Sequence, residues 1–397
     1  MLIPVDQALD SLLDAAKCKN KVEQLPLMSG LGKTLAEDII SNMNVPPADN
    51  SAMDGYAVRL ADIQLGQAVK INQRIPAGVA PSPLNPNEAA RIFTGANIPS
   101  GADTVIMQEN AAESEGSVRF SSIPDRVGEN IRRAGEDIAA QSKVLEKGMK
   151  LRAQELGLIA SIGIESIPLF TPLKVAVIST GSELVDPGEP INLGQIYNSN
   201  RPMLMSLLQS LGYEPLDLGI CGDSLTETID ALQSAAEKAD VIITSGGVSV
   251  GEEDHVKAAA ESLGDIDLWK VAIKPGKPFA FGNIIGVPLL GLPGNPASVF
   301  TTFLILAAPF LARLQGRSIN QSSGFKIPAS FSRRPVTRRE YLRVRNKDGQ
   351  LVPFPNQGSG VLTSACWGDG FAVQEIGESI GEGDLLEYLP FAALLNQ

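Results

Sequence analysis

The segment from residue 173 to residue 319 alternates short apolar runs with longer runs of helical periodicity, and this rhythm constrains the fold most strongly. The expected strands are 174–180, 214–220, 240–245, 268–273 and 287–292, and the expected helices are 200–212, 224–239, 254–264 and 297–314. Alternating strands and helices favour a parallel sheet that is covered by helices on both faces. We therefore expect a central α/β/α domain with a parallel sheet over 173–319.

Two of these expected helices carry further signals. In the helix at 200–212, we expect Asn200 at the N-cap, Pro202 in the first turn and Gly212 at the C-terminal end. The helix at 297–314 holds the longest apolar run, 299–312, which Pro309 interrupts. This run is too short to cross a bilayer, so we expect a buried helix and no membrane association.

The remaining segments predict further domains around the α/β domain. Residues 4–17 show helical spacing, and we expect 1–21 to form an N-terminal helix that packs on the α/β domain. Short β-rich runs indicate a small β-rich domain at 46–140, with 22–45 and 141–172 as a connecting domain. β character returns at 320–397, where Asp348 and Gly349 favour a hairpin in a β-barrel-like domain. The predicted fold is an elongated multidomain chain of the α/β plus β class.

Composition excludes several classes of protein. A chain of 397 residues is too long to fold around a single hydrophobic core, so several domains are expected. The net charge of −12 argues against a broad surface for nucleic-acid binding. The cysteines Cys18, Cys221 and Cys366 lie far apart, which predicts neither disulfides nor a thiolate metal site and fits the cytoplasm. The N-terminus has no basic region, so we expect no signal peptide. The single histidine, His255, excludes His-rich metal sites.

Three glycine-rich loops follow expected strands, at 179–184, 244–254 and 291–298. Ligands bind at the carboxyl ends of strands in open α/β sheets, and small residues let backbone N–H groups approach a phosphate. One such loop is more often a simple turn, but three in one sheet favour a phosphate-containing ligand. The candidate residues are Ser179, Thr180, Gly181, Ser245, Gly246, Gly247, Pro293, Gly294 and Asn295.

Carboxylates stand at the same strand ends: Glu183, Asp223 and Asp254. Carboxylates beside a phosphate site suit Mg²⁺, which takes oxygen ligands and bridges to substrate phosphates. Asp223 and Asp254 also fit the N-caps of the helices that follow them. Both interpretations remain open.

The run at 270–282 places Lys270, Lys274 and Lys277 on or after one expected strand. Lys270 and Lys274 would share a face if the run is extended, and an oxyanion would relieve their repulsion. A solvated edge strand is the alternative, but the apolar neighbours Trp269 and Phe279 argue against it.

Two short motifs mimic other enzymes. The run at 30–35 is similar to a P-loop, but Leu27 stands where the pattern needs glycine. The run at 247–251 matches the elbow of serine hydrolases, but Ser249 would need His255, which is only six residues further on. We reject both.

Polar turns at 46–58, 93–109 and 132–137 carry Asp54, Thr94 and Asp137, which the residues alone do not rank as catalytic. These turns belong to eight segments that resemble, in this order, blocks of one known family: PADNSAMDGYAV, FTGANIPSGADTVI, RRAGEDI, STGSELV, GQIYNSN, TSGGVSVGEED, KPGKPFAFG and GLPGNPAS. The chain is similar over its whole length to the MoeA-type molybdopterin molybdenumtransferases, a family that includes the gephyrin E domain.

The resemblance implies four subdomains and a cytoplasmic homodimer that inserts molybdate into adenylylated molybdopterin, with Mg²⁺-dependent release of AMP. A molybdopterin adenylyltransferase would be the upstream partner. It implies that Glu183, Asp223 and Asp254 lie at the metal and pyrophosphate end of the substrate. Lys270, Lys274, Arg343 and Ser364 match oxyanion positions for molybdate. Asp54, Thr94 and Asp137 match positions that the partner chain supplies to the cleft, and His255 stands where the family has an aromatic residue.

Two other functions remain as alternatives. An adenylyltransferase would share the α/β domain, but the β-rich and C-terminal domains argue against it. A non-catalytic scaffold of the gephyrin E domain kind would need an interaction tail or linker, which the sequence does not suggest.

Overall fold

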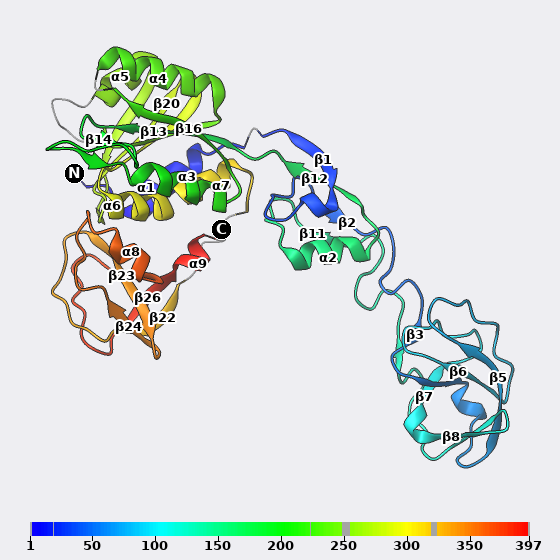
Figure 1. Ribbon diagram of the computed structural model, residues 1–397. Helices are drawn as coiled ribbons and strands as arrows, with labels where there is room; N and C mark the ends of the chain where they lie inside the picture. The colour runs from blue at the N-terminus through cyan, green and yellow to red at the C-terminus, as the bar shows by residue number, and fades with distance from the viewer. Residues whose placement is uncertain (1, 19, 223, 248–254, 319–323, 396–397) are drawn as a thin grey trace.

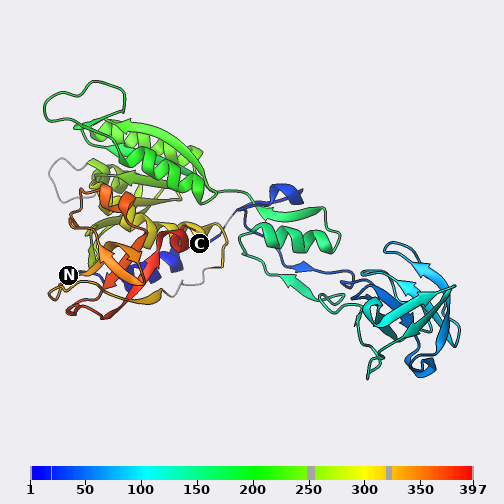
Figure 2. The same ribbon diagram turned by 60° about the horizontal axis from the view of Figure 1, so that its bottom comes forward.

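The computed structural model describes residues 2–18, 20–222, 224–247, 255–318 and 324–395. The chain is elongated: the α/β domain lies at one end with the C-terminal β domain beside it, and the small β-rich domain lies at the other end (Figure 1). A second view keeps the same separation, with the connecting unit between the two ends (Figure 2). The predicted fold class, an elongated chain of α/β and β domains, is confirmed.

The central sheet has six strands in the order β16-β13-β17-β21-β20-β18. Their bounds are β13 Lys174–Thr180, β16 Glu214–Cys221, β17 Val241–Ser245, β18 Gly264–Lys270, β20 Pro278–Ile284 and β21 Val287–Leu292. β16, β13, β17 and β21 run parallel, as the sequence predicted, but β20 is antiparallel to both of its neighbours, β21 and β18. The expected all-parallel sheet is therefore wrong at one edge, where a tight turn at Ile285 and Gly286, both with positive φ, joins β20 to β21.

Helices cover both faces of this sheet. Their bounds are α1 Val5–Ala15, α3 Asn200–Ser210, α4 Leu225–Lys238, α5 His255–Leu263, α6 Pro296–Thr302, the π-helical η4 Phe303–Ala307 and α7 Ala308–Leu314. α4 and α5 pack on one face through a core that includes Ile178 and Leu232. α1, α3 and α6–α7 pack on the other face, where Leu12, Leu208 and Phe310 belong to one larger core. The apolar face of α1 is thereby buried against the α/β domain.

The helix that continues from Pro296 to Leu314 has 19 residues and is long and apolar enough to cross a membrane by length and composition. However, 89% of its most apolar window is buried inside the protein, as expected of a core helix. Pro309 does not break it, in agreement with the single helix predicted over 297–314. The π-helical turn Phe303–Ala307 precedes this proline, and such a turn tolerates a missing N–H.

Two expected helix caps differ from the structure. Ser199 occupies the N-cap of α3, and Asn200 is its first helical residue. The Ser224 hydroxyl caps α4 by accepting from the Glu227 N–H at 3.2 Å. Asp223 and Asp254, the two predicted caps or metal ligands, lie outside the described residues.

The connecting unit and the small domain are built from short strands. In the connecting unit, β1 Val22–Pro26 pairs with β12 Ser166–Phe170, β2 Ile39–Ile40 pairs with β11 Lys143–Leu145, and α2 Ala153–Ser161 and the 3₁₀ turn Leu27–Ser29 complete the unit. The small domain has a sheet in the order β7-β4-β6-β5-β9-β8, with the pair β3 and β10 beside it. Their bounds are β3 Asn50–Ser51, β4 Gly55–Val58, β5 Ala68–Ile75, β6 Glu88–Ile92, β7 Thr104–Met107, β8 Ala111–Ser114, β9 Ser117–Phe120 and β10 Ile131–Arg132, with 3₁₀ turns Leu60–Asp62 and Gln108–Asn110.

The C-terminal domain holds a curled sheet in the order β19-β23-β25-β26-β22, with β24 paired to β23. Their bounds are β19 Ile273–Lys274, β22 Phe325–Pro328, β23 Arg339–Lys347, β24 Gln350–Pro353, β25 Gly370–Gln374 and β26 Leu385–Pro390, with helices α8 Thr363–Trp367 and α9 Phe391–Leu394. The predicted hairpin at Asp348 and Gly349 is confirmed, because both have positive φ and join β23 to β24. β19 follows β18 after two residues, yet it belongs to this second sheet.

Candidate functional site

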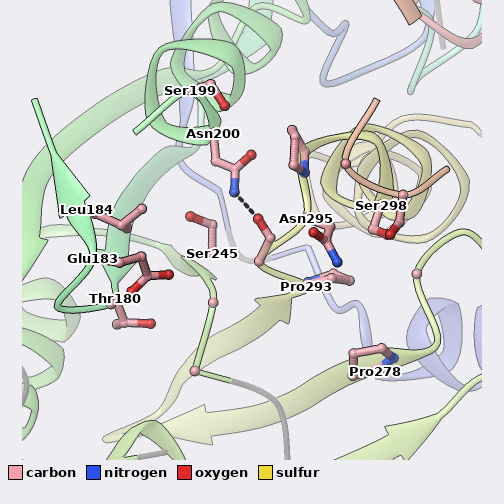
Figure 3. A pocket seen from close by; sticks show the side chains of 18 of the residues that line it. Thr180, Glu183, Leu184, Ser199, Asn200, Ser245, Pro278, Pro293, Asn295 and Ser298 are labelled. Carbon is pink, nitrogen blue, oxygen red and sulfur yellow. Dashed lines mark hydrogen bonds between the residues drawn. The ribbon is translucent and has the colours of Figure 1, made fainter. Parts of the chain in front are cut away.

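A cavity of about 940 Å³ opens at the carboxyl ends of β13, β17 and β21, where an open α/β sheet binds its ligands. The three predicted glycine-rich loops meet there. Their lining residues are Thr180, Gly181 and Glu183 after β13, Ser245, Gly246 and Gly247 after β17, and Pro293, Gly294 and Asn295 after β21. Figure 3 shows Thr180, Glu183, Ser245 and Asn295 around this common space. The short parallel pair β14 Leu184–Val185 and β15 Ile196–Tyr197 forms one wall.

Glycines allow the loops after β13 and β17 to approach closely. Gly246 has φ of +90°, and a Cβ atom there would lie 2.6 Å from the Thr180 carbonyl oxygen. Gly247 has φ of +65°, and a Cβ atom would lie 2.4 Å from a methyl group of Val256. Any larger residue would therefore meet both backbone strain and a clash. The paired glycines after a strand, which the sequence analysis singled out, therefore mark a place where two loops pack closely at the cavity.

Buried polar atoms gather around the same edge of the sheet without hydrogen-bond partners. Among the described residues, they include the hydroxyls of Thr180, Thr244 and Ser245 and the hydroxyl of Ser179, which lies buried behind the lining. A buried polar group without a partner costs about 1–3 kcal/mol, so a cluster of them indicates a polar ligand or water at this place. The cavity is thus lined by donors and acceptors that the protein itself leaves unsatisfied.

Asn200 links two walls of the cavity. Its amide Nδ2 donates to the Gly294 carbonyl oxygen at 2.7 Å, which Figure 3 marks with a dashed line. Its Oδ1 is buried and has no partner among the described residues. The residue that we expected to cap α3 therefore holds the β21 loop against α3 and offers an acceptor to the cavity.

Cations line the side of the cavity that faces the C-terminal domain: Lys274, Lys277 and Arg338. Lys274 belongs to β19, which pairs with β23 so that Lys274 stands opposite Glu340. The Lys274 ammonium lies 2.5 Å from a carboxylate oxygen of Glu340, whose other oxygen lies 2.7 Å from Arg333. The buried Glu340 carboxylate thereby fixes Lys274 at the rim of the cavity.

The predicted pairing of Lys270 with Lys274 on one face is wrong. Lys270 ends β18 in the central sheet, whereas Lys274 lies in the C-terminal sheet. The chain leaves one sheet and joins the other within four residues, which a single extended strand cannot do. Lys270 is exposed and does not line the cavity.

Arg343 and Ser364 support the cavity from behind. Only 1% of Arg343 is exposed; its guanidinium donates to the Ser364 hydroxyl at 2.9 Å and to the Gly358 carbonyl at 3.1 Å. Burial lowers the pKa of Arg343 to about 10. Neither residue lines the cavity, so the expectation that both face molybdate does not hold in this structure. They brace the loop 357–360 instead.

That loop is the main part of the cavity that sequence reasoning missed. Gln357, Gly358, Ser359 and Gly360 all line it. The Gln357 side-chain oxygen accepts from the Arg343 N–H at 3.0 Å, and the Gln357 side-chain nitrogen donates to the Arg343 carbonyl oxygen at 2.9 Å. A short polar loop of this composition has no distinctive motif, and its contacts with Arg343 and with α6 bring it to the site. His255 also lines the cavity, at the start of α5.

The helix that follows β21 offers fewer anion-binding groups than expected. Pro296, its first residue, has no N–H, and the Ala297 N–H donates to the Ser359 carbonyl at 3.0 Å. A helix N-terminus binds anions through free N–H groups. Anion binding in this cavity therefore relies more on the glycine loops and the cations.

The predicted metal site is only partly described. Glu183 lines the cavity beside the hydroxyl groups of Thr180 and Ser245, while Asp223 and Asp254 lie outside the described residues. Within the described ranges, no group of three His, Cys, Asp or Glu residues could hold a metal ion. Glu183, Thr180 and Ser245 offer oxygen atoms, which suit Mg²⁺ with ligands completed by substrate.

Asp54 and Thr94 form a second polar cluster, in the small domain. One Asp54 oxygen accepts both from the Thr94 N–H and from the Thr94 hydroxyl, each at 2.8 Å. These bonds, the backbone donor first, hold the pKa of Asp54 below its ordinary value. Asp137 lies on an exposed turn, and its backbone N–H donates to the Val45 carbonyl oxygen at 3.0 Å. The small domain is at the far end of the chain from the cavity (Figures 1 and 2), so these residues do not join the cavity of their own chain.

The fold and the cavity together define a multidomain α/β protein with a polar, glycine-lined ligand site at the carboxyl edge of its central sheet. Three sequence profiles match the chain. They are described as "MoeA N-terminal region (domain I and II)" for residues 3–163, "Probable molybdopterin binding domain" for 176–313 and "MoeA C-terminal region (domain IV)" for 327–391.

Known proteins resemble the chain along its whole length. A molybdopterin molybdenumtransferase from Haemophilus influenzae is 41% identical and covers 100% of both chains. A protein of the same name from Bacillus subtilis is 36% identical over 89% of this chain and 85% of its own. A crystal structure of the molybdopterin biosynthesis moeA protein from Pyrococcus horikoshii superposes with a TM-score of 0.85 at 28% identity, covering 98% of this chain and 100% of that one. The chain belongs to the MoeA family of molybdopterin molybdenumtransferases.

Proposed function

We propose that this chain inserts molybdate into adenylylated molybdopterin and releases AMP, which yields molybdenum cofactor. The observation that carries the proposal is the set of unsatisfied hydroxyl groups and crowded glycines at the carboxyl edge of the sheet. A pyrophosphate offers acceptors to N–H and O–H donors, and a cavity of about 940 Å³ has room for the larger adenylylated pterin that carries it. The names of the family relatives support the pterin as substrate.

We assign the two anionic ends of the reaction to opposite sides of the cavity. The loops that carry Thr180, Ser245 and Gly246 would hold the pyrophosphate. Lys274, Lys277 and Arg338 would bind the tetrahedral molybdate dianion, because Lys and Arg donors suit such an anion. These local cations offset the net charge of −12, which would otherwise repel two anionic substrates.

Mg²⁺ fits the pyrophosphate side. Glu183 would be its described ligand, with Asp223 and Asp254 as the other proposed carboxylates. A bound Mg²⁺ would neutralise charge on the phosphate oxygens while water cleaves the phosphoanhydride. Glu183 would orient the substrate, and the glycine loops would keep its phosphates at hydrogen-bond distance.

We further propose that the active form is a homodimer in which the small domain of one chain completes the cavity of the other. Asp54, which is half-buried, is paired with the exposed Thr94 at the far end of the chain, and neither lines the large cavity of its own chain. A carboxylate kept ionised by two donors suits a role as base or as a ligand of a cation. The three free cysteines support a reducing compartment, the cytoplasm.

The first test measures AMP release by the purified chain from adenylylated molybdopterin and Mg²⁺, with and without molybdate. We expect release that depends on molybdate and ceases when the metal is chelated. Formation of adenylylated pterin from ATP and metal-free molybdopterin would instead favour an adenylyltransferase. A folded dimer without either activity would leave the scaffold alternative.

The second test mixes two inactive variants, Asp54→Ala and Glu183→Ala. If each site uses one small domain and the α/β domain of the other chain, half of the sites in a mixed dimer are intact. Since random mixing makes half of the dimers mixed, we expect about a quarter of the wild-type activity. Failure to recover any activity from dimers that exchange subunits would contradict the composite site, but not the reaction itself.

A further inference from the structure

A second cavity of about 450 Å³ lies where the α/β domain meets the connecting unit. Three stretches of chain form it: Cys18 and Asn20 after α1, Lys147 and Phe170 of the connecting unit, and 313–318 at the end of α7. Hydrogen bonds join these stretches. The Ser318 N–H donates to the Gly148 carbonyl at 3.0 Å, and the Asn20 amide donates to the Thr171 carbonyl at 3.2 Å.

The charged side chains that line this cavity are all cationic. They are Lys147, Arg313 and Arg317, and no acidic side chain of the described ranges lines it. Lys147 and Arg313 are exposed, and neither side chain forms an ion pair with a described residue. The Lys147 backbone N–H donates to the Asp38 carboxylate at 2.7 Å, and the Lys147 ammonium lies 5.6 Å from the centroid of the Phe170 ring. Arg317 is 4% exposed and fixed in place, because its guanidinium donates to the Thr34 hydroxyl at 3.1 Å and to the Leu211 carbonyl at 2.8 Å.

A neighbouring lysine, Lys150, lies within reach of the positive charge of Arg317. The pKa of Lys150 is lowered to about 8, first by burial and then by the charge of Arg317. A nearby carboxylate would act in the opposite direction. Such a concentration of positive charge is unusual in a chain with a net charge of −12.

We infer that this cavity is a binding site for a tetrahedral oxyanion, separate from the large cavity and held by Lys147 and Arg313 across the junction. Lys147 comes from the connecting unit and Arg313 from α7, so one dianion would join the two parts of the chain by charge-assisted hydrogen bonds. The buried charge of Arg317 adds to the attraction from the floor of the cavity. Inorganic phosphate, a phosphate ester and molybdate share this chemistry.

Cys18 provides a local probe, because its thiol lines the cavity and is exposed. Cys366 is exposed in the C-terminal domain, and Cys221 is buried. The wild-type chain is alkylated with iodoacetamide in phosphate, molybdate, AMP or chloride of equal ionic strength, and each cysteine is followed by peptide mass spectrometry. We expect at least one oxyanion to slow the alkylation of Cys18 several-fold while the rate at Cys366 is unchanged. The arm with the largest effect identifies the source of the anion.

Two double variants make the test specific. Lys147→Gln with Arg313→Gln removes the proposed ligands, and we expect the oxyanion effect on Cys18 to disappear. Arg126→Gln with Lys347→Gln removes two exposed cations elsewhere and should keep the full effect. Circular dichroism checks that both variants fold. Equal rates at Cys18 in every anion, or undiminished protection in the Lys147/Arg313 variant, would overturn the site, whatever the result of the AMP-release assay.

Discussion

The large cavity of the α/β domain differs from the Asp54–Thr94 cluster of the small domain in how its polar groups are hydrogen-bonded before a ligand binds. In the cavity, the hydroxyls of Thr180 and Ser245 are buried and unsatisfied. In the small domain, Asp54 already holds two donors from Thr94. The first region is completed only by a ligand, whereas the second is organised before any ligand arrives.

This difference indicates which region would supply the binding energy for the substrate and which would supply the reactive group. A ligand gains hydrogen bonds in the cavity that the free protein lacks, so the cavity supplies affinity. The Asp54 carboxylate would gain little from a ligand because its geometry and its charge state are set in advance, so under the proposed function the small domain would supply a positioned reactive group. Substitutions in the two regions should therefore affect different quantities.

The largest expected effect comes from Asp54→Ala. We expect AMP release to fall by about 10²-fold or more, the scale of a lost acid or base group, with little change in substrate binding or in the unfolding midpoint. Asp62→Ala is the matched control, because Asp62 also accepts a backbone N–H, from Asn87, in the same domain. Steady-state kinetics and urea unfolding of both variants provide the measurement. Normal activity of Asp54→Ala would contradict the proposal that the small domain supplies the reactive group.

Gly246→Ala should act on binding. The new Cβ atom would lie 2.6 Å from the Thr180 carbonyl at a φ of +90°, so the two loops must separate. We expect affinity for the adenylylated pterin to fall about 10-fold, the equivalent of 1.4 kcal/mol. Gly286→Ala has a similar φ of +88° with open space around it, so it isolates the backbone strain. Calorimetric titration of both variants should show weak binding only for Gly246→Ala.

Thr94→Val should move the pH dependence without abolishing activity. Thr94 lowers the pKa of Asp54, so loss of its hydroxyl raises that pKa toward the ordinary 3.8, while the backbone N–H remains. A depressed pKa keeps the carboxylate ionised at lower pH, and the acid limb of kcat/KM should therefore shift to higher pH in the variant. Thr104→Val, which removes a hydroxyl bonded to Asp103, should leave the profile in place. An unshifted acid limb in Thr94→Val would show that Asp54 does not govern it.

The smallest expected effect concerns Lys150, in the connecting unit between the two regions. Its folded pKa of about 8 lies below the ordinary 10.5, so the unfolded chain binds more protons between these values and stability rises with pH there. Lys150→Met should stabilise the protein at neutral pH by on the order of 1 kcal/mol after solvent screening, and should flatten that rise. Lys143→Met is the control of opposite sign, because ion pairs raise the pKa of Lys143. Urea unfolding at neutral and alkaline pH measures both.

The sequence predicted the cavity loops because their signals are local. Strand period, paired glycines and the position after a strand place Gly246 and Gly294 without knowledge of the rest of the fold. The same local logic predicted the hairpin at Asp348 and Gly349 and most helices of the α/β domain.

The misplaced residues depend on contacts between distant segments. Lys270 and Lys274 separate because the chain changes sheets between them, and the pairing of β19 with β23 spans more than sixty residues of sequence. Arg343 is predicted at the ligand but lies buried behind Gly358, since its guanidinium finds partners in a loop without a recognisable motif. No periodicity or turn signal reports which of two sheets a strand will join.

The passage of β19 into the C-terminal sheet limits how this chain can be divided. A fragment that ends after α7 would carry β19 without its partner, and a C-terminal fragment would expose the edge of β23 that β19 covers. Exposed strand edges invite association with other chains. The α/β and C-terminal domains therefore form one inseparable unit for recombination, although each has its own sheet, and any exchange of modules between relatives must keep this strand with both.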